Sequence, residues 1–332
     1  MKAIQISEFG SYDTLTLVDV PAPAPTAGKV LVRMRLAGVN PLDDTVRSGA
    51  LPSANKLPLV PGTGGVGEVA DNGGVDSLKP GTPVVVAGRG YGMFRNGTWQ
   101  EYLLTDPQDL IPLPSGIDLA AVAAFTTGGG YLTGYLSLTE LAAFTPGQTV
   151  LAPGIGGAVG LGTVEVAKRL GASLAISTAS RTDKAERARA EGHTVIDLSK
   201  ETLRDGIARL TDGRGVDVVV DGVGGPFTGG EALASLAPGG TLVSVGYAGG
   251  KQASVNITDI IWRSAHIRGF MFTLFSTQTL IEANTNLFRY LAEGAFHPSI
   301  ARAFPLKDAA EATRHLIEDR PYGRVVLEVP GA

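Results

Sequence analysis

The sequence predicts an α/β protein with two domains, one β-rich and one built on a doubly wound parallel sheet. The first observation is the length of 332 residues, which is too great for a single hydrophobic core. The second is a change of pattern near residues 115–118. Short strand-like segments separated by turn residues precede this point, and strands alternate strictly with helices beyond it.

The N-terminal third contains apolar segments of strand length bounded by Gly and Pro. In KVLVRMRLAGVN (29–40), Val30, Val32 and Met34 share one face, as in a half-buried strand. Further strands are predicted at KAIQI (2–6) and TPVVVAG (82–88). This part of the chain is therefore an irregular β-rich domain.

The second pattern begins with a helical run over residues 118–142 and continues as alternating strands and helices. The predicted strands are VLAPG (150–154), SLAIST (173–178), TVID (194–197), VDVVVDG (216–222), TLVSVGYAG (241–249) and HIRGFMF (266–272). Such a βαβ succession predicts a parallel sheet with right-handed crossovers. A last strand, GRVVLEV (323–329), needs a sheet edge to join and could return to the first domain.

Composition narrows the class of protein. The net charge is −4, and Lys and Arg are scattered along the chain, which argues against nucleic acid or an anionic membrane as a partner. There is no apolar run long enough for a membrane helix, and MKAIQISEFG does not resemble a signal peptide, so a cytoplasmic protein is expected. Cysteine is absent, which excludes disulfides, thiolate nucleophiles and Cys-ligated metals.

A glycine-rich turn, PGIGGAVG (153–160), lies between a predicted strand and a predicted helix. Gly154, Gly157 and Gly160 fit the pattern G-x-x-G-x-x-G in that context. Glycine permits the tight turn and lets backbone amides approach a pyrophosphate at the helix N-terminus. The expected cofactor-binding residues are therefore Gly154, Ile155, Gly156, Gly157, Ala158, Val159 and Gly160. The alternative is a turn that binds no ligand.

The residues after the second strand of this domain select the cofactor. An acidic residue there would bind the ribose 2′-OH of NAD, but the position is occupied by Ala179. Ser180, Arg181 and Lys184 follow and favour a 2′-phosphate, which predicts NADPH as the cofactor. The alternative is a solvated helix start in which Lys184 pairs with Glu186 or Glu191.

Together these segments resemble the medium-chain dehydrogenase/reductase superfamily, specifically its zinc-independent quinone oxidoreductase (zeta-crystallin-like) branch. The resemblance spans essentially the whole chain and is carried by residues 37–49, 60–69, 153–160, 215–225, 236–246 and 323–329. It implies a GroES-like catalytic domain over 1–118 and 273–332, a Rossmann domain over 119–272, and an active-site cleft where they meet. It also implies a homodimer.

The resemblance and the missing metal ligands together predict the reaction. Zinc-dependent relatives use Cys and His, with a Gly-His-Glu triplet where this chain has Gly62, Thr63 and Gly64, and no metal site is expected. Hydride from NADPH is then best delivered to an activated acceptor, a small-molecule quinone or α,β-unsaturated carbonyl compound. The alternatives are a 2-enoyl-thioester reductase and a non-catalytic NADPH-binding or redox-sensing protein.

The resemblance implies four catalytic residues. Asn40, Asp43 and Arg47 match an Asn-x-x-Asp-x-x-x-Arg stretch, with Asn40 as a donor to substrate oxygen and Asp43 as a polar or proton-relay group. Equally, Asp43 and Arg47 could pair and hold the loop. Thr133 matches a threonine near the nicotinamide, although its hydroxyl could instead bond a carbonyl one helical turn back.

The remaining implied cofactor positions lie at later strand ends. They are Val223, Gly246, Tyr247, Phe270, Met271 and Phe272, whose aromatic members could equally be ordinary core. One departure concerns the proton donor, because many relatives have a tyrosine where this chain has Leu51. Tyr91 or Tyr131 could substitute for it.

Overall fold

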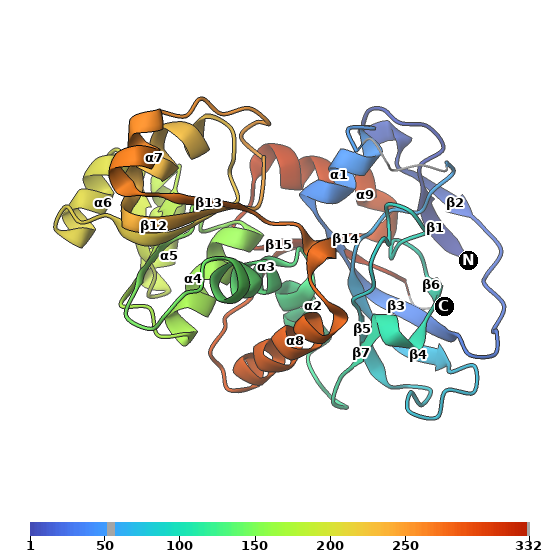
Figure 1. The fold of residues 1–332 in the computed structure, drawn as a ribbon. Helices are drawn as coiled ribbons and strands as arrows, with labels where there is room; N and C mark the ends of the chain where they lie inside the picture. The colour runs from blue at the N-terminus through green and yellow to red at the C-terminus, as the bar shows by residue number, and fades with distance from the viewer. Residues whose placement is uncertain (52–56, 331–332) are drawn as a thin grey trace. The chain divides into compact units, whose positions relative to one another are not determined.

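The computed structural model describes residues 1–51 and 57–330, which form two compact units (Figure 1). Unit 1 comprises Met1–Gly128 and Pro298–Ala332, and unit 2 comprises Gly129–His297. Within the described residues, no helix is both long and apolar enough to cross a membrane.

Unit 1 is β-rich. Its main sheet runs in the order β14-β15-β3-β4-β5-β7, with β6 also paired to β3. The strands are β3 (Val30–Val39), β4 (Gly65–Asp71), β5 (Pro83–Val86), β6 (Tyr102–Thr105), β7 (Leu110–Pro112), β14 (Ile300–Pro305) and β15 (Arg324–Glu328). A separate antiparallel pair is formed by β1 (Lys2–Gln5) and β2 (Thr16–Asp19).

The C-terminal strand joins the sheet formed by the N-terminal residues. β15 runs antiparallel to β3, with Val326 opposite Gly38, and Figure 1 shows the red β15 in the same unit as the blue β3. Val32, Met34 and Leu327 are fully buried in the apolar core of this unit. The helices are α1 (Pro41–Arg47), α2 (Leu119–Thr126) and α9 (Ala309–Arg314).

Unit 2 is an open parallel sheet with strand order β10-β9-β8-β11-β12-β13. The strands are β8 (Thr149–Leu151), β9 (Leu174–Ala179), β10 (Thr194–Asp197), β11 (Val216–Asp221), β12 (Leu236–Ser244) and β13 (His266–Gly269). The helices are α3 (Gly130–Leu136), α4 (Ala158–Arg169), α5 (Thr182–Ala190), α6 (Leu203–Thr211), α7 (Ile257–Arg263) and α8 (Thr277–Ala292). The chain order reverses between β8 and β11, where ligands bind in doubly wound folds. The predicted fold class is confirmed.

The unit boundaries fall later in the chain than the predicted residues 118 and 272. The predicted helical run over 118–142 is broken at Gly128 and Gly129, which have φ of +82° and +60°. α2 packs on β3 and β4 of unit 1, whereas α8 packs on α3 of unit 2. Tertiary packing therefore decides to which unit each of these helices belongs.

Candidate functional site

The glycine-rich turn connects β8 to α4. Gly154 has φ of +81°, a conformation that favours glycine. Its N–H donates to Thr178 Oγ1 (3.1 Å), and the N–H of Ile155 donates to the Thr178 carbonyl (2.9 Å). Thr178 therefore fixes the turn to the end of β9, a role that was not predicted from the sequence.

The first turn of α4 lies directly on this glycine turn. A Cβ added at Gly160 would stand 2.2 Å from the Gly154 carbonyl oxygen, so no side chain fits there. Gly157 is the N-cap residue and provides no side-chain cap, which leaves the amides of Ala158 and Val159 without a side-chain acceptor at this end. Such a helix start suits a pyrophosphate, because its amides and dipole favour an anion.

α3 packs closely on α4, and its residue Thr133 is half-buried. A Cβ at Gly130 would stand 2.0 Å from the Ala158 carbonyl oxygen, and one at Gly162 would stand 2.6 Å from the Gly130 carbonyl carbon. The alternative hydrogen bond of the Thr133 hydroxyl to a carbonyl one turn back is not formed among the described residues. That hydroxyl is thus available for a ligand.

The residues after β9 carry an exposed ion pair. Arg181 Nε and Nη2 donate to Asp183 Oδ1 and Oδ2 at 2.9 and 2.5 Å. Ser180 is exposed beside them, and Lys184 is half-buried in the first turn of α5. Glu191, one of the two expected partners of Lys184, accepts a hydrogen bond from Arg187 Nε (3.0 Å). The Arg181–Asp183 pair was not predicted.

The turns that follow β11 and β12 lie against each other. Buried Asp221 ends β11 and accepts hydrogen bonds from the backbone N–H groups of Val223 (2.8 Å) and Gly224 (3.0 Å). A Cβ at Gly246 would stand 2.5 Å from the Gly222 carbonyl oxygen, so glycine is required for this approach. Asp221 was missed, although an acidic residue that ends the apolar run VDVVV is a readable signal.

The side chains predicted to flank the cofactor after β12 and β13 are partly exposed to solvent. Tyr247 is half exposed, with Lys251 Nζ 5.8 Å from its ring centroid. Phe270 is half-buried, and its N–H donates to the Ser244 carbonyl (2.9 Å). Met271 is 58% exposed and Phe272 is half-buried, so these residues are not fully buried core in unit 2.

In unit 1, Asn40 stands between β3 and α1. Its side-chain Nδ2 donates to Thr63 Oγ1 (2.9 Å), and its backbone N–H donates to Asp43 Oδ2 (2.8 Å). Thr63 is the middle residue of the Gly62–Gly64 segment. Its contact with Asn40 was not predicted from the sequence.

Asp43 is a buried carboxyl group, 1% exposed. Burial raises its pKa to about 7, although hydrogen bonds from the backbone N–H groups of Asn40, Gly62 and Thr63 act in the opposite direction. Its second oxygen, Oδ1, has no hydrogen-bond partner among the described residues. Asp43 therefore accepts a hydrogen bond from the backbone of Asn40 at the start of α1 and titrates near neutral pH.

Arg47 does not pair with Asp43, so that alternative is wrong. Its Nη2 and Nε donate to Asp44 Oδ1 at 2.6 and 2.9 Å, one helical turn back on α1. Its guanidinium also donates to the Gly10 carbonyl and lies 4.4 Å from the Tyr12 ring centroid. These contacts direct Arg47 toward the N-terminal segment of unit 1.

The hydroxyl groups of both tyrosines considered as proton donors, Tyr91 and Tyr131, form hydrogen bonds with carboxylate groups. Burial raises the pKa of Tyr91 to about 12, and its hydroxyl donates to Asp109 (3.0 Å). The buried Tyr131 hydroxyl donates to Glu165 (2.6 Å). Leu51 packs on the apolar core of unit 1.

The described residues contain no group of three or more His, Cys, Asp or Glu side chains that could hold a metal ion. Gly62 has φ of +101°, and an added Cβ would stand 2.4 Å from Trp99 Cδ1. This segment is a tight backbone turn.

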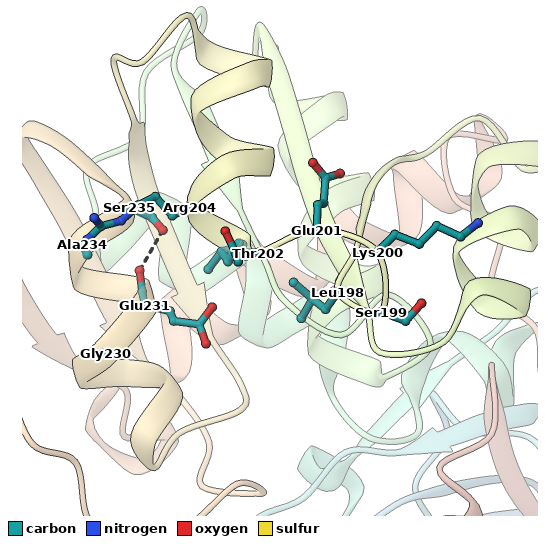
Figure 2. Close-up of a pocket in the computed structure, with 11 residues that line it drawn as sticks. Leu198, Ser199, Lys200, Glu201, Thr202, Arg204, Gly230, Glu231, Ala234 and Ser235 are labelled. Atoms are coloured by element: carbon teal, nitrogen blue, oxygen red, sulfur yellow. Dashed lines mark hydrogen bonds between the residues drawn. The ribbon is translucent and has the colours of Figure 1, made fainter.

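A cavity of about 660 Å³ lies in unit 2, and no residue of the glycine turn lines it. It opens between the loop after β10 and the short helical turns η4 (Thr228–Ala232) and η5 (Leu233–Ser235). Figure 2 shows Lys200, Glu201 and Glu231 around it. None of the predicted cofactor residues lines this cavity, so it carries no cofactor assignment.

Comparison with known families matches two segments of the chain. Residues 26–115 match the alcohol dehydrogenase GroES-like domain, and residues 158–287 match the zinc-binding dehydrogenase family. The family name of the second match refers to zinc, although this chain has no cysteine.

Individual relatives match along nearly the whole chain. Quinone oxidoreductase of Pseudomonas aeruginosa is 33% identical, with 98% of this chain and 99% of that protein covered. Escherichia coli quinone oxidoreductase complexed with NADPH is 27% identical, with a TM-score of 0.86 over 99% of this chain and 100% of that chain. A structure of an NAD-dependent alcohol dehydrogenase is 29% identical, with a TM-score of 0.88 over 99% and 100%.

Proposed function

This chain belongs to the medium-chain dehydrogenase/reductase superfamily, in its quinone oxidoreductase branch, and from this premise we propose a zinc-independent, NADPH-dependent reductase of quinones or α,β-unsaturated carbonyl compounds. The observation that carries the proposal is the arrangement at the ends of neighbouring strands β8 and β9. A glycine turn lined by backbone amides follows β8. At the end of β9 the position expected for an acidic residue is Ala179, and Arg181 follows it.

NADPH binds unit 2 through two chemical features. The turn from Gly154 to Gly160 holds the pyrophosphate, and Ser180, Arg181 and Lys184 hold the 2′-phosphate. One structural neighbour is described as NAD-dependent, so the fold alone does not select the cofactor and these side chains decide. When bound, NADPH supplies hydride from nicotinamide C4.

The protein's own contribution to the reaction is hydrogen bonding to the acceptor oxygen. Asn40 Nδ2 has two N–H groups, one of which is used by Thr63, and the other donates to the quinone or enone oxygen. Asp43 contacts the backbone of Asn40 and holds its side chain in place. Thr133 contributes its hydroxyl near the nicotinamide. An acceptor that is already activated needs no metal ion beyond these donors.

The proposed function is tested by NADPH oxidation with a panel of quinones, small enones and crotonyl-CoA. We expect turnover with quinones or small enones, and a roughly tenfold or greater loss of kcat/KM in Asn40→Ala with an unchanged Kd for NADPH. Asn72→Ala, which removes another hydrogen-bonded asparagine of unit 1, is the matched control. Turnover with crotonyl-CoA alone would identify an enoyl-thioester reductase, and NADPH binding without any turnover would identify a non-catalytic protein.

We also propose that the protein is a homodimer formed through unit 2. β13 is the last strand of its sheet, and all of its residues are exposed. On α7, Ile257, Ile261 and Trp262 are 61%, 66% and 78% exposed. An exposed strand edge beside large apolar side chains is typical of a surface that pairs with a second copy.

A further inference from the structure

Arg181, the proposed ligand of the cofactor 2′-phosphate, forms an ion pair with Asp183. The two side chains stand at the start of α5 and are 62% and 60% exposed. The contact is bidentate through Nε and Nη2, so the carboxylate occupies one full edge of the guanidinium. The other edge, formed by Nη1 and the second N–H of Nη2, faces no acceptor among the described residues.

The carboxylate also lowers the positive charge that a phosphate would meet. The Arg181 guanidinium beside Asp183 holds the pKa of that carboxyl below its usual range, so Asp183 is ionised at neutral pH. A 2′-phosphate that binds Arg181 therefore approaches a second anion on the same guanidinium. Like charges at this separation repel, and the repulsion grows with the charge of the phosphate.

The neighbouring carboxylate is arranged differently. Asp197, at the end of β10, is 1% exposed and accepts hydrogen bonds from Thr182 Oγ1 (2.8 Å) and Ser199 Oγ (2.6 Å). Lys200 Nζ lies 3.7 Å from Asp197. Asp197 thus serves to hold the start of α5, whereas the carboxylate of Asp183 is presented to solvent.

We propose that Asp183 is a specificity residue that competes with the cofactor 2′-phosphate for Arg181 and so restrains the preference for NADPH over NADH. The inference rests on the proposed function, because it takes Arg181 as the phosphate ligand. NADH has an uncharged 2′-hydroxyl group and meets no such repulsion. Asp183 consequently weakens the binding of NADPH but not that of NADH. It thereby reduces the difference between the affinities for the two cofactors.

Calorimetric titration of the full chain with NADPH, NADH and 2′,5′-ADP tests this competition. In Asp183→Asn we expect the Kd for NADPH and 2′,5′-ADP to fall about threefold to tenfold, with the Kd for NADH changed less than twofold. The difference from wild type should shrink at high salt, where surface charges are screened. Glu186→Gln changes the net charge equally but acts one turn further along α5, so it should alter each Kd less than twofold.

Arg181→Ala distinguishes a failure of the cofactor assignment from a failure of the proposed competition by Asp183. If it leaves the Kd for 2′,5′-ADP unchanged, Arg181 is not the phosphate ligand and the cofactor assignment itself fails. If it raises that Kd while Asp183→Asn leaves it unchanged or raises it, the assignment stands and the competition is refuted, because Asp183 then merely orients Arg181. Circular dichroism of each variant confirms that α5 and the fold are retained.

Discussion

At Asp43, burial and hydrogen bonding act against each other. The backbone N–H of Asn40 donates to its carboxylate, yet burial favours the neutral form and raises its pKa to about 7. The folded protein thus keeps a proton on Asp43 at pH values where the unfolded chain, with an ordinary pKa of 3.8, has released it. A group of this kind makes stability depend on pH.

We predict that wild-type stability falls as pH rises from about 5 to about 7, and that Asp43→Asn flattens this slope. Between the two pKa values the folded state binds more protons than the unfolded state, so the free energy of unfolding decreases by up to about 1.4 kcal/mol per pH unit. The contribution is largest in acid and levels off above about pH 7. Urea unfolding at several pH values measures it.

A matched control for this prediction is Asp76→Asn, which removes an exposed carboxyl group of unit 1. This variant should keep the wild-type slope. An equal slope in wild type and Asp43→Asn would show that Asp43 is ionised in the folded protein across this range.

At the scale of elements, the junction of β8 and α4 depends on the absence of a side chain at Gly160. We predict that Gly160→Ala destabilises the protein by about 1–3 kcal/mol and weakens NADPH binding at least tenfold, because the new methyl group would displace the Gly154 carbonyl and open the turn. Chemical denaturation and calorimetric titration measure the two effects.

Gly230→Ala is the matched control for this element, because a Cβ there meets nothing within 4 Å and the residue lacks a positive φ. It should change stability by less than about 1 kcal/mol and leave NADPH binding unaltered. Normal NADPH affinity in Gly160→Ala would instead indicate that the glycine turn serves only chain geometry.

The alternation of strands and helices in unit 2 was predictable because each element has its own periodicity of apolar residues. The helical run over 118–142 was the exception. Its composition favours one long helix, but Gly128 and Gly129 adopt left-handed conformations that end α2 before α3 begins. α2 packs on β3 and β4 of unit 1. A pair of glycines indicates a break in a helix, whereas the direction taken after the break depends on packing.

At the scale of the whole molecule, the exposed edge of unit 2 is expected to bind a second copy. We predict that the wild type has twice the mass of one chain in light scattering, and that Trp262→Glu shifts it to a monomer, because a charge would be buried in the apolar contact. Phe94→Glu, which alters an exposed aromatic residue of unit 1, should leave the mass unchanged. A monomeric wild type would refute the dimer.

The candidate site was predictable to the extent that it depends on local sequence. The glycine turn from Gly154 to Gly160 was recognised because the strand, turn and helix that define it are contiguous. Thr178 and Thr63 were missed, because each is important only through a hydrogen bond to a residue more than twenty positions away. Threonine is too common for such a role to be read from sequence.

Sequence alone determined the fold class, the glycine turn, the cation after β9 and the absence of thiolate ligands, because these are properties of residue type and order. Tertiary structure alone decided that Arg47 contacts Gly10 and Tyr12, that Thr178 fixes the glycine turn and that Asp43 is buried. The reason is physical: the charge state and the partner of a side chain depend on which groups the fold brings within a few ångströms of it and on how much water it excludes.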